Sequence, residues 1–374
     1  MAEYKMVRLG DYITEYSVKN KSNEDIPVYS VTNTQGFCTE YFSKDVSSKD
    51  KSNYKIVPRG CFAYNPSRIN VGSVDWQRYE DRVIVSPLYN VFKVSPELEN
   101  QYLYYFLKSD IGHTLITSKA EGSVRDNLKI TMLAEFSIPL PPLETQKLIA
   151  AQLDKCTALI AKHKQMLEKY DTLIKSRFIE MFGDKPVESG KWKVEKLEDV
   201  CDLITDGTHK TPNYQQKGIR FISAKNIING KIDLTDTKFI TEEEYKQIQK
   251  RCRVEKNDVL LTKSGSLGSS AIIDFDIPIG LFESLAVIKY KRNLLNGIFV
   301  KELLSAESSQ KQFNNGVKGI AIKHLHLNVI AALKIPIPPI KLQNDFAQFV
   351  QQIDKSKFEI ANSLKRLYNK GMLS

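Results

Sequence analysis

The stretch Ile138-Pro139-Leu140-Pro141-Pro142-Leu143 opens a long amphipathic segment that continues to about Phe182. Behind the prolines, apolar residues recur at alternating steps of four and three, the heptad period of a helix packed along another helix. The prolines lack N–H donors and favour extended neighbours, so the helix can begin only after them. The predicted seam positions are Ile149, Leu153, Ile160, Leu167 and Ile174, with Cys156, His163 and Tyr170 between them.

The same proline motif occurs again near the end of the chain as Ile335-Pro336-Ile337-Pro338-Pro339-Ile340. Gln343 follows the last of these prolines by four residues, just as Gln146 follows Pro142. Two apolar seams in one chain can bury each other, so we expect two long helices packed lengthwise. The seam positions predicted for the second helix are Phe346, Ile353, Ile360 and Leu364.

The regions that precede the two helices also repeat one another. Leu9 and Asp11 match Leu197 and Asp199, and from residue 57 onward matching positions lie 197 residues apart. Short β-rich runs, such as residues 286–290, occur together with helical ones, such as residues 101–107. We predict an α+β chain with an internal duplication: a globular domain over 1–137, a helical spacer over 138–185, a second globular domain over 186–334 and a second helical spacer over 335–374.

The composition is that of a globular protein, with 42% hydrophobic residues and a net charge of +10. This charge is compatible with a polyanionic partner, although many soluble proteins are equally basic. The five cysteines are widely spaced and form no CxxC pair, so they indicate neither a disulfide framework nor a zinc site. No signal peptide opens the chain and no apolar run approaches the roughly 20 residues of a membrane span, so we expect a soluble, cytoplasmic protein.

Three stretches resemble catalytic or ligand-binding motifs but lack essential parts of them. Asn65-Pro66-Ser67-Arg68 lacks the second proline and the aromatic residue of the amino-methyltransferase loop, and no Gly-rich turn that could seat S-adenosylmethionine is present. The stretch from Lys263 to Gly268 lacks the Gly-Lys-Ser/Thr end of a phosphate loop. His324 and His326 have no third ligand at metal spacing. We therefore expect no catalytic residue, metal or cofactor in this chain.

Polar and basic loops occur at matching places in the two globular regions. Arg, Lys, Asn and His side chains read base edges, while Ser, Thr and Lys fix phosphates. Each residue alone is more simply a solvated surface group, and the recurrence at matching positions favours DNA binding. The candidate DNA-binding residues are Asn65, Ser67, Arg68, Asn70 and Arg125 in the first region, and Thr208, His209, Lys210, Lys225, Asn226, Lys263, Ser264, Ser266, Lys323 and His324 in the second.

Together these features resemble HsdS, the DNA specificity subunit of bacterial Type I restriction-modification systems. The resemblance covers essentially the whole chain. It rests on the duplicated order of domain and helix, the paired proline motifs with their glutamines, the openings at Leu9 and Leu197, and Asp206-Gly207-Thr208-His209. It implies two target recognition domains that each read one half of a bipartite, asymmetric site in double-stranded DNA, held apart by an antiparallel coiled coil with pseudo-twofold symmetry.

The same resemblance implies partners that carry out the chemistry. Two modification subunits would dock on the coil, bind S-adenosylmethionine and methylate adenine N6. Restriction subunits would use ATP and Mg to translocate and cut DNA, so this chain would hold none of those active sites. A helix of about 38 residues is about 57 Å long, enough to separate two readers by more than one DNA turn of about 34 Å.

Two other functions stay open at this point. A stand-alone adenine-N6 DNA methyltransferase would need the cofactor loop and the complete motif around Asn65-Pro66, and both are missing from the sequence. A non-enzymatic coiled-coil scaffold, with globular ends that bind protein, would differ in electrostatics, because DNA binding weakens steeply as salt rises.

Overall fold

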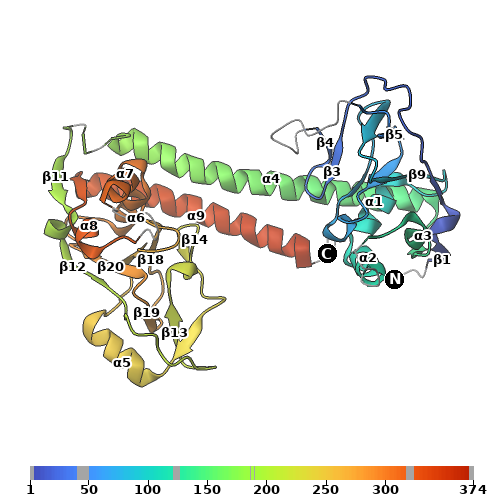
Figure 1. Ribbon diagram of the computed structural model, residues 1–374. Coiled ribbons are helices and arrows are strands. Elements are labelled where there is room, and N and C mark those ends of the chain that lie inside the picture. The colour runs from blue at the N-terminus through green and yellow to red at the C-terminus, as the bar shows by residue number, and fades with distance from the viewer. Residues whose placement is uncertain are drawn as a thin grey trace. The chain divides into compact units, whose positions relative to one another are not determined.

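The computed structural model describes residues 4–39, 50–120, 127–185, 187–188, 190–316 and 324–369. It divides into two compact units, one of residues 1–164 with 362–374 and one of residues 165–361. Each unit contains one mixed helix and sheet domain, so the predicted α+β class is confirmed. The long helices α4 (Leu143–Phe182) and α9 (Ile340–Asn369) each contribute residues to both units (Figure 1).

A four-stranded antiparallel sheet in the order β2-β9-β6-β7 forms the centre of the first domain. Phe62 and Phe92 stack in its core with ring centroids 5.0 Å apart, in the same apolar cluster as Leu103 of the first helix. The sheet strands are β2 (Ile13–Glu15), β6 (Phe62–Tyr64), β7 (Val74–Trp76) and β9 (Asn90–Val94). The remaining elements are β1 (Met6–Arg8), η1 (Leu9–Asp11), β3 (Ser30–Thr32), β4 (Gly36–Cys38), β5 (Lys55–Pro58), η2 (Ile69–Val71), β8 (Arg82–Val85), α1 (Asn100–Lys108), α2 (Asp110–Ala120), α3 (Ile130–Leu133) and β10 (Ser137–Pro139).

The second domain is built around a sheet of the same strand order, β12-β20-β17-β18. These strands are β12 (Cys201–Asp206), β17 (Val259–Thr262), β18 (Ser270–Ile272) and β20 (Leu285–Tyr290). The other elements before α9 are β11 (Lys193–Lys196), η3 (Leu197–Val200), β13 (Ile219–Ile222), η4 (Ala224–Asn226), β14 (Ile227–Ile228), β15 (Lys231–Ile232), β16 (Lys238–Ile240), α5 (Glu242–Arg251), β19 (Ile279–Leu281), α6 (Gly297–Ser305), α7 (Glu307–Gly316), α8 (Leu327–Ala331) and β21 (Lys334–Ile337).

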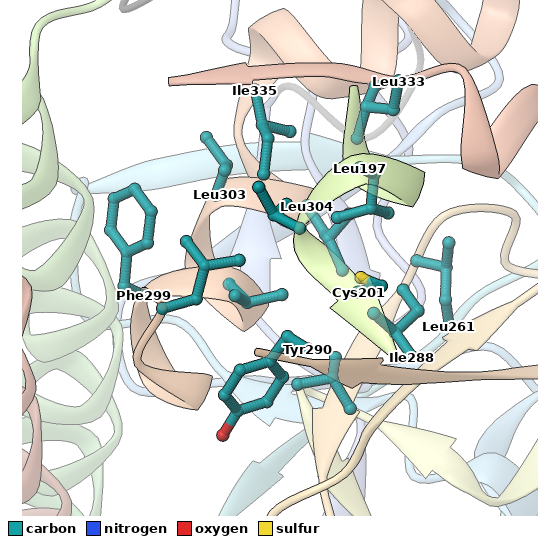
Figure 2. Packing of buried hydrophobic residues seen from close by; sticks show 14 of the residues in the cluster. Leu197, Cys201, Leu261, Ile288, Tyr290, Phe299, Leu303, Leu304, Leu333 and Ile335 are labelled. Carbon is teal, nitrogen blue, oxygen red and sulfur yellow. The ribbon is translucent and has the colours of Figure 1, made fainter. Parts of the chain in front are cut away.

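The core of the second domain is formed where α6 packs on this sheet. Leu303 and Leu304 of α6 point into the same apolar interior as Ile288 of β20 and Ile335 of β21 (Figure 2). All four side chains are buried, and apolar burial of this kind contributes roughly 1.5–3 kcal/mol for each fully buried side chain. This core fixes the sheet from which the candidate binding loops project.

The backbone repeats at the spacing read from the sequence. The turns before β6 and β17 place Gly60 and Asn257 at φ +83° and +71°, a left-handed conformation that Gly adopts freely and Asn tolerates. Each domain also pairs its first strand with its last, as β1 with β10 and as β11 with β21. The second domain adds a three-stranded sheet, β16-β13-β19, against which α5 packs.

Both long helices begin directly after their prolines, as predicted, because Leu143 and Ile340 are their first residues. Within the second unit, Phe178 and Phe182 of α4 lie with ring centroids 5.6 and 5.5 Å from that of Phe346 of α9. Eleven residues further along α9, the Lys357 ammonium forms an ion pair with Asp171 of α4. Residue numbers therefore run in opposite directions, and the helices of this unit pack antiparallel.

The predicted seam divides into three groups. Ile174, Phe346 and Ile353 share one buried apolar cluster of the second unit, which is compatible with their predicted seam positions. Ile149 packs against the core of the first domain, so the first turns of α4 attach this domain to the helix, a use that the heptad pattern does not predict. For the others the pairing stays a prediction: Ile160 is buried, and Leu153, Leu167, Ile360 and Leu364 are half-buried.

The structure also bears on disulfide bonds and on membrane-spanning helices. The five cysteines, Cys38, Cys61, Cys156, Cys201 and Cys252, all lie within the described residues and form no disulfide bond. In the part of the chain that the structure describes, every helix is too short or too polar to cross a lipid bilayer.

Candidate nucleic-acid interface

In the first domain, the loop that follows β6 carries four of the predicted binding residues. Its turn is held by Asn65, whose side-chain oxygen accepts hydrogen bonds from the Ser67 N–H at 3.1 Å and the Ser67 hydroxyl at 2.9 Å. Ser67 and Arg68 are exposed, while Asn70 is half-buried and its side-chain oxygen has no protein partner. The loop therefore presents a hydroxyl and a guanidinium at the surface, from a turn held by hydrogen bonds.

This loop is anchored to the sheet at its base. The Tyr64 hydroxyl donates to the Leu128 carbonyl at 3.0 Å and accepts from the Asn90 amide at 2.9 Å. The Leu128 N–H donates to the Pro66 carbonyl at 3.1 Å. Since Tyr64 is buried, these bonds form in a region of low dielectric, where they are stronger than at the surface.

The equivalent loop of the second domain follows β17 and is held in the same way. The Leu325 N–H donates to the Lys263 carbonyl at 2.8 Å, which repeats the bond between Leu128 and Pro66 with both residues 197 positions further along the chain. The loop carries three predicted residues: Lys263 is buried, Ser264 is half-buried and Ser266 is exposed. The two domains thus place loops of different composition on the same scaffold position.

A second predicted stretch, Thr208 to Lys210, lies beside the segment that joins β19 to β20. The Thr208 N–H donates to the Leu281 carbonyl at 2.9 Å, and the Glu283 N–H donates to the Thr208 carbonyl at 3.0 Å. A side chain at Gly207 would place its Cβ 2.1 Å from the Leu281 oxygen, so the close approach requires glycine. Thr208 is half-buried, and His209 and Lys210 are exposed at this turn.

The centre of this region is the Asp206 carboxylate, which is 2% exposed. It accepts a hydrogen bond from the buried Lys263 ammonium and one from the Arg251 guanidinium at 2.6 Å, and His209 Nε2 lies 3.3 Å away. The Glu283 carboxylate lies 3.8 Å from the Lys263 ammonium. Buried charges are tolerated only when they are paired, and each of these groups has an opposite charge beside it.

Burial and neighbouring charges shift the pKa of Asp206 and that of His324. Burial alone would raise the pKa of Asp206, but the hydrogen bond and charge of Lys263, with His209 and Arg251, outweigh it and lower this pKa below its usual value. Burial, reinforced by the charge of Lys263, lowers the pKa of His324, whose Nε2 lies 3.8 Å from Glu283. At neutral pH His324 is therefore an uncharged imidazole, which can donate and accept hydrogen bonds.

A shallow pocket of about 420 Å³ lies on the same domain and is lined by Lys225, Ser266 and Ser269, among others. Lys225 is exposed, and its ammonium pairs with Asp236 at 3.1 Å. Asn226 is buried: it accepts from the Ser223 N–H at 3.0 Å and donates to two carbonyls of the following loop. The pocket offers hydroxyls and one cation, which suit an anionic ligand such as a phosphate.

The structure brings many, though not all, of the predicted residues together. Thr208, His209, Lys263 and His324 meet around Asp206 and Glu283. Lys263 and Asn226 are buried and bonded within the chain, so the expectation that their side chains contact DNA directly does not fit this structure. Arg125 and Lys323 lie outside the described residues.

Sequence reasoning missed Arg251 and Glu283. Arg251 ends α5 and reaches Asp206 across 45 residues of sequence, so no local spacing connects them. As a basic residue in the last turn of α5, Arg251 also complements the helix dipole, so its position in the sequence gives no signal of a binding site. Within the described residues, no group of three or more His, Cys, Asp or Glu side chains could hold a metal ion.

The comparisons with known proteins fit this geometry. The family model of the Type I restriction modification DNA specificity domain matches residues 1–169 and again residues 189–367. The chain belongs to this family. Its two matched segments correspond to the two domains with their helices.

Specificity subunits of Type I restriction enzymes are similar over large parts of the sequence. The EcoBI subunit of Escherichia coli is 28% identical over 274 residues, which cover 65% of this chain and 57% of that protein. The MjaVIII subunit of Methanocaldococcus jannaschii is 23% identical over 399 aligned residues, which cover 98% of this chain and 91% of that protein. The chain thus spans little more than half of the EcoBI subunit but nearly all of the MjaVIII subunit.

Solved structures show the fold of this family. The S subunit of a Type I restriction-modification system from M. genitalium matches with a TM-score of 0.59 at 14% identity, covering 99% of this chain and 95% of that one. A chain from a study of complex assembly and conformational transition of the type I R-M system matches with a TM-score of 0.59 at 17% identity, covering 100% and 96%. At these identities the likeness concerns the fold alone.

Proposed function

We propose that this chain is the DNA specificity subunit of a Type I restriction-modification complex. It recognises a bipartite, asymmetric site in double-stranded DNA, with one half read by each globular domain. Its α4 and α9 form an antiparallel coiled coil that spaces the two readers. The chain is not itself an enzyme, and it supplies the sequence specificity for chemistry carried out by other subunits.

The observation that carries this proposal is the pair of loops at equivalent scaffold positions. Both follow the third strand of the same four-stranded order, and both are anchored by the same backbone bond, to Pro66 in one domain and Lys263 in the other. The scaffold repeats, but the side chains that the loops expose differ. A protein that binds two different DNA sequences at a fixed distance requires this combination, because base contacts specify the sequence and the scaffold sets the register.

The partners follow from the same proposal. Two modification subunits dock on the coiled coil, bind S-adenosylmethionine and methylate adenine N6 within the site. Restriction subunits join this assembly and use ATP and Mg. The chain itself needs no cofactor.

A methyl-transfer assay tests the division of labour. The purified chain alone should transfer no label from S-adenosylmethionine to DNA, and the complex with its modification subunits should transfer it to a specific site. Affinity of that complex for site-containing duplex should fall by roughly 100-fold or more between about 50 and 200 mM salt, because phosphate contacts release counterions. Methyl transfer by the chain alone would contradict the proposal, and salt-independent or undetectable DNA binding by the complex would favour a protein-binding scaffold.

A further inference from the structure

Two buried glutamines, one at the start of each long helix, make the same three hydrogen bonds. The Gln146 side-chain oxygen accepts from the Glu99 N–H at 2.8 Å. Its NH₂ group donates to the carbonyl of Glu97 at 3.0 Å and to that of Pro141 at 2.9 Å. Gln146 has no exposed surface, its bond to the Pro141 carbonyl is buried, and its bonds to Glu97 and Glu99 are part-buried.

Gln343 repeats the arrangement in the second domain. Its oxygen accepts from the Asn296 N–H at 2.9 Å, and its NH₂ group donates to the carbonyls of Leu294 at 3.0 Å and Pro338 at 2.8 Å. It too has no exposed surface. Every partner lies 197 positions after its counterpart in the first domain, although two of the three partner side chains differ and only the prolines match. The conserved element is therefore the glutamine with three backbone groups.

These bonds connect each domain to its own helix. Glu99 and Asn296 are the N-cap residues of α1 and α6, the helices that pack on the two central sheets. Pro141 and Pro338 lie in the segments that lead into α4 and α9. One primary amide thus ties the start of a domain helix to the start of a long helix. Only Asn and Gln side chains carry both the acceptor and the two donors that this position uses.

We propose that Gln146 and Gln343 are positioning residues that fix the angle of each recognition domain on its helix, and that they thereby set the number of unspecified base pairs between the two DNA half-sites. This inference rests on the proposed function. Adjacent base pairs are about 3.4 Å apart along the DNA axis. A domain that tilts on its helix enough to move its loops by about this distance would read a gap one base pair longer or shorter, so loss of a clamp should weaken the choice of gap.

The test uses the complex of the full chain with its modification subunits. Methyl transfer from labelled S-adenosylmethionine is measured on duplexes with the native gap and with gaps one base pair longer or shorter. Gln146→Met and Gln343→Met, which keep the volume but remove the bonds, should each lower the preference for the native gap by about tenfold, because small misplacements of bound groups have effects of this size or larger. Gln152→Met and Gln351→Met, at exposed positions of the same helices, should leave the preference unchanged.

Hydrogen exchange gives a readout that does not depend on DNA. The Glu99 amide should lose protection in Gln146→Met, and the Asn296 amide in Gln343→Met, while the central strands stay protected. If circular dichroism shows that a Met variant is unfolded, Gln146→Asn and Gln343→Asn, which keep the amide but shorten its reach, are read in the same assays with the same expected results. A folded variant with the wild-type gap preference overturns the inference. A wild-type complex with no gap preference overturns the proposed function instead.

Discussion

The two domains share the way they attach to their helices but differ in their buried charges. Asp75 in the first domain accepts hydrogen bonds from the Phe37 and Trp76 N–H groups at 3.1 and 2.8 Å and pairs with Arg78, whose guanidinium lies 4.6 Å from the Trp76 ring centroid. Asp206 in the second is surrounded by Lys263, Arg251 and His209 instead. Both aspartates are 2% exposed.

This difference separates two kinds of constraint on the sequence. The glutamine clamps, the strand order and the loop anchors repeat because they hold the domains in place. The charge clusters are free to differ, because each needs only to be internally satisfied. A scaffold of this kind can change the DNA sequence that it reads without changing its geometry.

The largest effect is expected from breaking the charge cluster of the second domain. Asp206→Ala leaves the buried Lys263 ammonium without its main partner, and removing one member of a buried ion pair costs about 3–5 kcal/mol. Urea unfolding combined with hydrogen exchange should show this loss in β12 and β17, while the strands of the first domain keep their protection.

Lys263→Met is the matched control for this change. It removes the buried cation and leaves Asp206 bonded to Arg251 and His209, so it should destabilise the domain less than Asp206→Ala does. Equal losses of stability in the two variants, or a loss of protection that extends to the first domain, would contradict the view that the ion-pair cluster stabilises only the second domain.

A smaller effect is expected from exposed loop cations. Arg68→Ala in the first domain and Lys210→Ala in the second should each weaken DNA binding by the complex and reduce the salt slope by about 1 if the lost contact is to a phosphate. Each variant should relax sequence preference in one half of the site only if its contact is to a base edge, with about 1–3 kcal/mol of discrimination lost. An unfolded circular dichroism signal in either variant would mean that the residue packs rather than binds.

The smallest expected effect is a difference in how Asp206 and Asp75 contribute to stability as pH changes. The pKa of Asp206 is lowered, so its carboxylate stabilises the folded state above the unfolded value of about 3.9, and this contribution is lost as pH falls through the folded pKa. Burial raises the pKa of Asp75, although Arg78 opposes it, so the folded state takes up this proton first and gains stability as pH falls from the folded pKa to about 3.9. The stability of wild type relative to Asp206→Asn should fall on acidification, and that relative to Asp75→Asn should rise. Changes of the same sign would contradict the assignment.

Much of the scaffold could be predicted from the sequence, because its signals are local and repeated. The prolines before Leu143 and Ile340 determine where the long helices begin, and the heptad pattern includes Ile174, Phe346 and Ile353, which lie in one buried cluster. The shared offset identified Gln146 and Gln343 as equivalent, although not their bonds.

The candidate site was less predictable, because its contacts join residues far apart in the chain. Lys263 reads as a loop cation, but its burial depends on Asp206, which lies 57 residues away. Asn226 lies between polar residues, yet it is buried because the loop that ends near Asp236 folds over it. Such burial is decided by tertiary packing, which residue type and spacing do not encode.

The most direct test of the two-reader account is long-read sequencing of modified adenines in host DNA, with and without this chain, and with Lys210→Ala in its place. The account predicts two short specified sequences separated by a gap of constant length, which appear only with the chain, and any relaxation caused by Lys210→Ala should be confined to one of them. A single continuous motif, or the same pattern of modification without the chain, would contradict it.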